Sequence, residues 1–159
     1  MSARVGEENA QEAIERLFSS LSPTMWRAVL GYTGDPDIAA DAVAEAFTLA
    51  LEHPDDIRSP SGWLWRVAFR LATEEVKRRR KTSGDVPDRP LVSEEPAVDV
   101  LRALSRLSSR QRGAIVLHYY ADQPVAEVAR ILGSTPAAVR VHLMRGRNHL
   151  RDLLEEHDG

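Results

Sequence analysis

The chain has 159 residues, of which 28% are charged, and it contains no cysteine. This composition is typical of a soluble globular protein with one ordinary domain or two small ones, and the lack of cysteine excludes disulfides, thiolate metal sites and cysteine nucleophiles. No apolar run approaches the ~20 residues that cross a bilayer, and the N-terminal residues are too polar for a signal peptide. We therefore expect a cytoplasmic protein without membrane insertion.

The net charge of −3 hides a strong segregation of charge along the chain. Residues 1–58 hold 4 basic and 11 acidic residues, whereas residues 59–81 hold 7 basic and 2 acidic residues. A second basic tract, residues 136–151, contains four arginines and no acidic residue. Two basic tracts in an otherwise acidic chain indicate two separate surfaces that meet an anionic polymer.

Apolar residues recur at helical spacing along most of the chain, which predicts an all-α protein. We expect a first helix, or a pair broken at Ser22-Pro23, over about residues 8–33, and a second helix over about 35–53. After a loop at 53–60, a third helix begins near Ser61 and ends in the basic run 77–81. Cations suit the C-terminal end of a helix dipole, so this run also has a purely structural explanation.

Residues 82–96 contain three prolines and one glycine, which predicts a flexible linker. Beyond it, a helix is expected from near Ala97, and three further helix starts are marked by the residues that commonly begin helices. These are Ser108 with Gln111, Pro124, and Thr135-Pro136, while Gly133 is placed to close the helix that starts near Pro124. The prediction is two small helical domains, over 1–81 and 97–159, joined by the linker.

A short helix over about 124–132, a turn, and a longer helix from Pro136 to about Leu154 have the arrangement of a helix-turn-helix. The longer helix has one apolar face, and its opposite face is small and basic near the start, as entry into a DNA major groove requires. A solvated amphipathic helix in a bundle is the alternative. The candidate DNA-contacting residues are Thr135, Ala137, Ala138, Arg140, Val141, Met144, Arg145 and Arg147.

Four short motifs follow one another between Leu107 and Arg151: L-x-x-x-x-R, ending at Arg112; Y-Y, at 119–120; A-E-x-A-x-x-L-G, at 126–133; and V-x-x-x-L-x-R-G-R-x-x-L-R, from Val139. Together they resemble the C-terminal DNA-binding domain of bacterial RNA polymerase sigma factors of group 4, the extracytoplasmic-function (ECF) class. The resemblance implies that the recognition helix binds the minus-35 promoter element.

Two N-terminal stretches extend this resemblance. DPDIAADAVAEAFTLAL is similar to the family's D-x-V-x-E-x-F helix, which docks on the clamp helices of the polymerase β′ subunit, and SGWLWRVAF is similar to the helix that contacts the minus-ten element. The implied polymerase-binding residues are Asp41, Val43, Glu45 and Phe47, and the implied minus-ten residues are Trp65, Arg66, Arg70, Lys77 and Arg78. The sequence departs from the family pattern at Ala44, Leu49, Leu51, Gly62, Arg70, Val141 and His142.

The resemblance implies a sigma factor with a domain 2 helical bundle and a domain 4 helix-turn-helix. Its partners would be core RNA polymerase, through the β′ clamp helices and the β flap, promoter DNA and an anti-sigma protein. It would not be an enzyme and would need no cofactor, because the chemistry belongs to the polymerase. Two alternatives stay open: an autonomous helix-turn-helix regulator with an N-terminal sensing or dimerisation domain, and a degenerate sigma relative that acts as a protein-interaction module.

The sequence also predicts how far four aromatic residues are buried and the absence of a metal site. Trp63 and Trp65 are two positions apart and cannot face the same way on a helix, so we expect Trp63 inside and Trp65 partly exposed. Tyr119 and Tyr120 are expected to pack under the helix-turn-helix. The five histidines lack metal-ligand spacing, so no metal site is expected.

Overall fold

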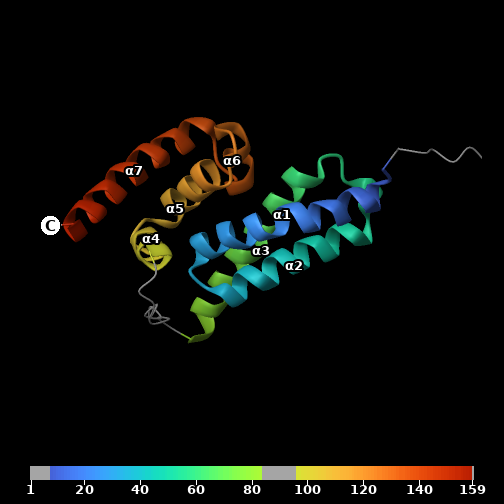
Figure 1. Cartoon of the computed structure of the whole chain (residues 1–159), viewed down its shortest axis with the longest axis horizontal. Coiled ribbons are helices and arrows are strands. Elements are labelled where there is room, and N and C mark those ends of the chain that lie inside the picture. Colours follow the sequence, from blue (N-terminus) through green and yellow to red (C-terminus); the bar gives the residue numbers. More distant parts are fainter. Residues whose placement is uncertain (1–7, 84–95, 159) are drawn as a thin grey trace, which may run out of the picture.

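In the computed structural model, residues 8–83 and 96–158 are described, and their regular structure is entirely helical, which confirms the all-α prediction. The N-terminal half consists of α1 (Ala10–Thr33), α2 (Pro36–Glu52), the short 3-10 turn η1 (Pro54–Asp56) and α3 (Pro60–Ser83). The C-terminal half consists of α4 (Pro96–Ser105), α5 (Ser109–Ile115), the π-helical turn η2 (Val116–Tyr120), α6 (Val125–Leu132) and α7 (Pro136–Asp158) (Figure 1). Most of the predicted linker, 84–95, lies outside the described residues.

Three helices begin at side chains that cap them, and two of these, Ser108 and Thr135, are among the helix starts that the sequence predicted. Asp35 accepts hydrogen bonds from the backbone N–H groups at the start of α2, Ser108 accepts one at the start of α5, and Thr135 accepts one at the start of α7. Each bond satisfies an N–H group that has no partner within its own helix. Gly133 ends α6 with φ of 64°, in the left-handed region that glycine adopts without strain.

The first helix is continuous, so the broken pair considered from the sequence does not form. Pro23 lies inside α1, where its missing N–H removes one helical hydrogen bond. Met25, Ala28 and Val29 follow directly and are fully buried. Their burial against the other helices outweighs the loss of a single bond, because each buried aliphatic side chain contributes about 1.5–3 kcal/mol.

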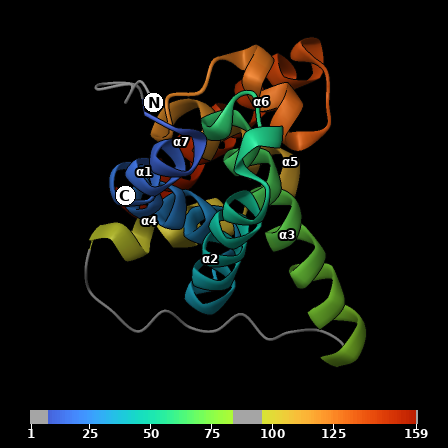
Figure 2. The ribbon, with the colours of Figure 1, turned by 90° about the vertical axis from the view of Figure 1, so that its right-hand side faces the viewer.

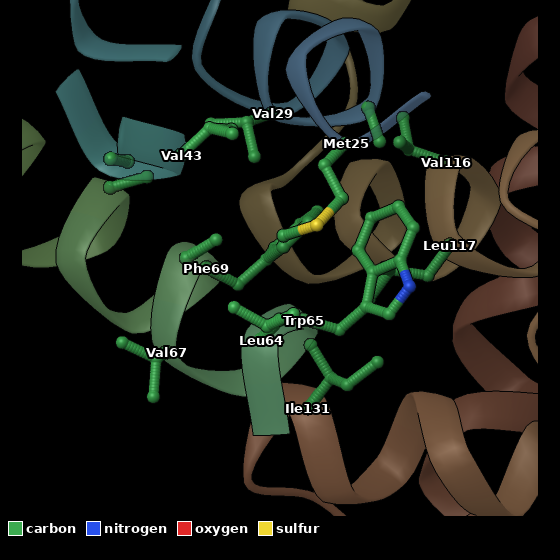
Figure 3. Packing of buried hydrophobic residues seen from close by; sticks show 14 of the residues in the cluster. Met25, Val29, Val43, Leu64, Trp65, Val67, Phe69, Val116, Leu117 and Ile131 are labelled. Carbon is green, nitrogen blue, oxygen red and sulfur yellow. The ribbon is translucent and has the colours of Figure 1, made fainter. Parts of the chain in front are cut away.

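The three long helices pack into a bundle whose core runs on into the C-terminal half. Figure 1 shows α1, α2 and α3 side by side, with α5, α6 and α7 grouped beyond one end. In Figure 2, α6 lies over the beginning of α3. Buried side chains of both halves form a single cluster, in which Met25, Phe69 and Trp65 of the first half meet Leu117 and Ile131 of the second (Figure 3).

The two neighbouring tryptophans of α3 are placed the other way round from our expectation. Trp65 is 1% exposed, whereas Trp63 is only partly buried. Figure 3 shows the Trp65 indole between Met25 of α1 on one side and Leu117 and Ile131 of the second half on the other. The prediction failed because the sequence pattern of α3 cannot show that residues about 50 to 65 positions later cover its second face.

We expect Trp65→Ala to lower the free energy of unfolding by about 3–5 kcal/mol, because it leaves a cavity between the halves. Trp63→Ala is the matched control and should cost clearly less, since that side chain keeps contact with water. Urea unfolding followed by circular dichroism measures both losses. Equal losses would show that the two indoles are not placed as described.

Candidate nucleic-acid interface

The helix predicted to recognise DNA, α7, is fixed by its apolar face. Val139 is fully buried, Leu143 is 4% exposed, and Gly146 is also buried, as the sequence predicted. The glycine allows α7 to lie close against α5, because a Cβ atom at this position would be 3.0 Å from Cγ1 of Ile115. This contact holds α7 across α5 and leaves its opposite face open.

The open face of α7 has an apolar middle and a basic edge on each side. At about 100° per residue, Arg140 and Arg147 fall on one edge, Arg145 falls on the other, and Val141 and Met144 lie between them. Val141 is 37% exposed and Met144 is 49% exposed, which is unusual for such side chains. A helix of this design can place small and apolar groups and Arg140 against base edges while Arg145 and Arg147 face the two phosphate backbones.

The edge that carries Arg145 receives a further cation from α5. Burial lowers the pKa of His142, and the nearby cations Arg110 and Arg145 lower it further. The basic character of this edge therefore comes from Arg110 and Arg145 together. Sequence reasoning missed Arg110, because it lies outside the helix-turn-helix and is brought to α7 only by the folded packing.

The adjacent tyrosines before the helix-turn-helix are exposed, contrary to the prediction that they pack beneath it. Tyr119 and Tyr120 are 48% and 45% exposed. They end η2, the wide turn that continues α5. The Tyr119 hydroxyl accepts a hydrogen bond of 2.5 Å from Nη1 of Arg147 on α7.

The five residues implied to read the minus-ten element divide into two groups. Arg70, Lys77 and Arg78 are exposed along α3, whereas Trp65 is buried and Arg66 is only partly exposed. Arg78 donates two hydrogen bonds to the Glu75 carboxylate, and together with Arg79 it lowers the pKa of Glu75 to about 2. The last turns of α3 are therefore open to an anionic partner, while its first turns are covered.

The cover over the start of α3 comes from α6 and η2. Arg66 lies 4.0 Å from the carboxylate of Glu127 on α6, and a Cβ atom at Gly62 would lie 3.0 Å from Oε1 of Glu127. That oxygen and Nε1 of Trp65 are both buried without a hydrogen-bond partner. A buried polar group without a hydrogen bond costs about 1–3 kcal/mol, so these two atoms lower the stability of the contact between the halves.

A second set of contacts between the halves is made by Arg112, the arginine of the first C-terminal motif. Its Nε donates to the carbonyl of Tyr32 at the end of α1, and its Nη1 donates to the carbonyl of Leu107. Its guanidinium also lies 5.7 Å from the centre of the Tyr32 ring. Burial lowers the pKa of Arg112, although an arginine remains charged at any physiological pH.

The four residues implied to bind polymerase are split between the two faces of α2. Asp41 and Glu45 are exposed, whereas Val43 and Phe47 are 5% and 3% exposed and belong to the core. Phe47 packs edge-on against Phe18, with ring centres 5.2 Å apart. In this arrangement the two carboxylates can contact a partner directly, and the two apolar side chains hold α2 in place.

Among the described residues, no three metal-binding side chains come together in a group that could hold an ion. No helix in the same part of the chain combines the length and apolar character that a membrane crossing needs. The arrangement that remains is a helical bundle with an exposed basic helix end, joined to a helix-turn-helix with a basic recognition helix. These features define a helical protein with a helix-turn-helix and two basic surfaces.

Comparison with known proteins identifies the family. Residues 17–82 match the family model of Sigma-70 region 2, and residues 97–150 match that of Sigma-70, region 4. The chain is 30% identical to the ECF RNA polymerase sigma factor SigL of Mycobacterium tuberculosis over 171 aligned residues, which cover 97% of each protein. It is 29% identical to the ECF RNA polymerase sigma factor BldN of Streptomyces coelicolor, over 97% of this chain and 64% of BldN. The chain belongs to the ECF RNA polymerase sigma factors.

Two solved structures share the fold across both halves. The sigma factor RpoE in complex with the anti-sigma factor NepR from Bartonella quintana superposes with a TM-score of 0.80 at 19% identity, over 91% of this chain and 98% of RpoE. CnrH in complex with the cytosolic domain of CnrY superposes with a TM-score of 0.71 at 21% identity, over 96% of this chain and 92% of CnrH. At these identities the likeness shows the fold alone.

Proposed function

We propose that this sigma factor binds core RNA polymerase and directs it to promoters by reading two DNA elements. The observation that carries the proposal is the presence of regions 2 and 4, in that order, in one chain. The open face of α7 would contact the minus-35 element, and the exposed cations of α3 would contact DNA near the minus-ten element. The N-terminal match leaves no need for a sensing or dimerisation domain, which removes the support for an autonomous regulator.

The remaining assignments follow from this role. The two functional units are residues 1–81 and 97–159, joined by 82–96, and the protein works in the cytoplasm with the polymerase that supplies the chemistry. Asp41 and Glu45 contact the β′ clamp helices, and the C-terminal unit contacts the β flap. An anti-sigma protein is a further partner, as it is for the RpoE of Bartonella quintana.

The closed packing of the two halves has to open before both elements can be read together. The elements are centred about 25 base pairs apart, which is roughly 85 Å of duplex at ~3.4 Å per base pair. In the structure the start of α3 touches α6, and α6 adjoins the recognition helix (Figure 2). A helix of 24 residues is only about 36 Å long, so the closed chain cannot span that distance.

A disulfide across the two halves tests whether opening is required. A Cβ atom at Gly31 would lie 3.3 and 3.9 Å from the two methyl groups of Val116, so cysteines at these positions would have Cβ atoms about 4 Å apart, within disulfide range. The protein has no cysteine of its own to compete. We expect Gly31→Cys/Val116→Cys to be inactive in run-off transcription with core polymerase when oxidised, and active again after reduction.

The two single-cysteine variants, oxidised in the same way, control for damage by the substitutions. Full transcription by the oxidised double variant, with the disulfide verified by mass spectrometry, would show that promoters are read in the closed form. Failure of the wild type and of the reduced variant to transcribe would instead contradict the sigma function itself.

Reversing the exposed charges of α2 should weaken binding to core polymerase. We expect Asp41→Lys/Glu45→Lys to reduce the affinity at least tenfold, since two attractive contacts become repulsive, without a change in helical content. Glu12→Lys/Glu15→Lys makes the same charge change on exposed positions of α1 and serves as the control. Fluorescence anisotropy titration with core polymerase measures both, and normal binding by the α2 variant would place the polymerase contact elsewhere.

The position of Arg140 on α7 predicts a loss of base preference. Arg140 lies in the second turn of the recognition helix and can make a bidentate contact to guanine, worth about 1–3 kcal/mol of discrimination. Arg140→Ala should therefore relax preference at one or two base pairs, whereas Arg145→Ala should weaken all sequences alike and reduce the salt slope by about one unit. Holoenzyme binding to a minus-35 library at several salt concentrations distinguishes them. The reverse result would mean that another face of α7 enters the groove.

A further inference from the structure

The turn between the first and second helices of the helix-turn-helix domain contains an exposed tyrosine, Tyr119, to which the proposed function assigns no role. Helices α5, α6 and α7 form a three-helix unit, and η2 ends the first helix just before the connection to α6. In three-helix DNA-binding domains, the recognition helix enters the major groove while the connection between the first two helices contacts the DNA backbone. In this chain Tyr119 stands at the start of that connection.

The ring of Tyr119 packs against a neighbouring side chain, and its hydroxyl points toward the recognition helix. Its ring packs edge-on against His118, with centres 5.0 Å apart, and Nδ1 of His118 lies 2.9 Å from the carbonyl oxygen of Gln123. Its hydroxyl lies 2.5 Å from Nη1 of Arg147. Because Arg147 and Arg140 are seven residues apart, they share one edge of α7. The tyrosine therefore extends that basic edge from α7 onto η2.

The chemistry of the pair favours an anionic oxygen ligand. The Tyr119 oxygen accepts one N–H of the guanidinium, which leaves the hydroxyl hydrogen and the other N–H groups of Arg147 available as donors. Among the described residues, no carboxylate pairs with Arg147. Donors converging on an exposed edge, without an acidic neighbour, match one phosphate group of a DNA backbone.

We propose that Tyr119 is a positioning residue for minus-35 binding: it holds Arg147 in place so that the two side chains together bind one backbone phosphate. The inference rests on the proposed function and adds a contact outside the recognition helix. A long, exposed arginine otherwise samples many rotamers, and fixing it before binding reduces the entropy lost on the DNA. The contact strengthens binding without reading sequence, because every base pair presents the same phosphate.

The test uses holoenzyme assembled from core polymerase and the full chain, with duplexes that vary only in the minus-35 element. Tyr119→Phe keeps the ring and its packing on His118 but removes the hydroxyl. We expect binding to weaken about three- to tenfold on every sequence, the range for one lost hydrogen bond. Tyr120→Phe makes the same chemical change at the neighbouring exposed tyrosine and should leave the affinity unchanged.

Dependence on Arg147 separates positioning from a structural role. Arg147→Ala should lower the slope of log affinity against log salt by about 0.9, as expected for one lost phosphate contact. Adding Tyr119→Phe to that variant should weaken binding clearly less than it does in the wild type, because only the tyrosine's own contact with the phosphate is then lost. A tyrosine that stabilised the domain without acting through Arg147 would weaken binding equally in both backgrounds.

Three results would overturn the inference: wild-type affinity for Tyr119→Phe, an undiminished effect of Tyr119→Phe in the Arg147→Ala background, or a changed base preference, which would indicate direct contact with a base. These are distinct from failure of the proposed function. In that case the wild-type holoenzyme itself would not discriminate between minus-35 sequences.

Discussion

The Trp65 indole occupies the space between the start of α3 and the corner formed by η2 and α6, and the arrangement of both halves depends on it. The side chain is 1% exposed, although Leu117, which covers one side of it, is about 50 residues away in sequence and Met25, on its other side, belongs to α1 (Figure 3). Glycines allow the backbones around it to approach, since Cβ atoms at Gly31 and Gly62 would come within 3.3 and 3.0 Å of the opposite half. The contact is therefore tight, yet it leaves two buried polar atoms without a hydrogen-bond partner.

Local signals were sufficient to predict most of the fold. Side-chain caps at Ser108 and Thr135, and the left-handed glycine at 133, depend only on residues within the same turn, and each is present in the structure. The buried face of α7 was likewise predictable, because the spacing of its apolar residues has a single solution on a helix. The continuity of α1 through Pro23 was not, since it depends on packing against helices further along the chain.

The candidate site was less predictable for the same physical reason. The sequence of α3 contains two tryptophans of equal hydrophobicity, and only the approach of α6 decides that Trp65 is buried. The exposure of Tyr119 depends on the π-helical turn, whose extra residue rotates the following side chains away from the helix core. Arg110 is a surface arginine by any local criterion, and its proximity to His142 arises from the packing of α5 against α7.

Gly62 is one of the positions at which this chain departs from the family pattern, where a threonine is common. The contact between α3 and α6 explains why a small residue fits there. The Cβ atom of a threonine there would lie 3.0 Å from Oε1 of Glu127, so the Glu127 side chain would have to shift. A chain that can close hides Trp65, Leu117 and Ile131, which otherwise form an apolar patch of the kind that drives aggregation. Glycine at this position therefore lets the Glu127 side chain lie directly over the backbone of α3, in the contact that covers this patch.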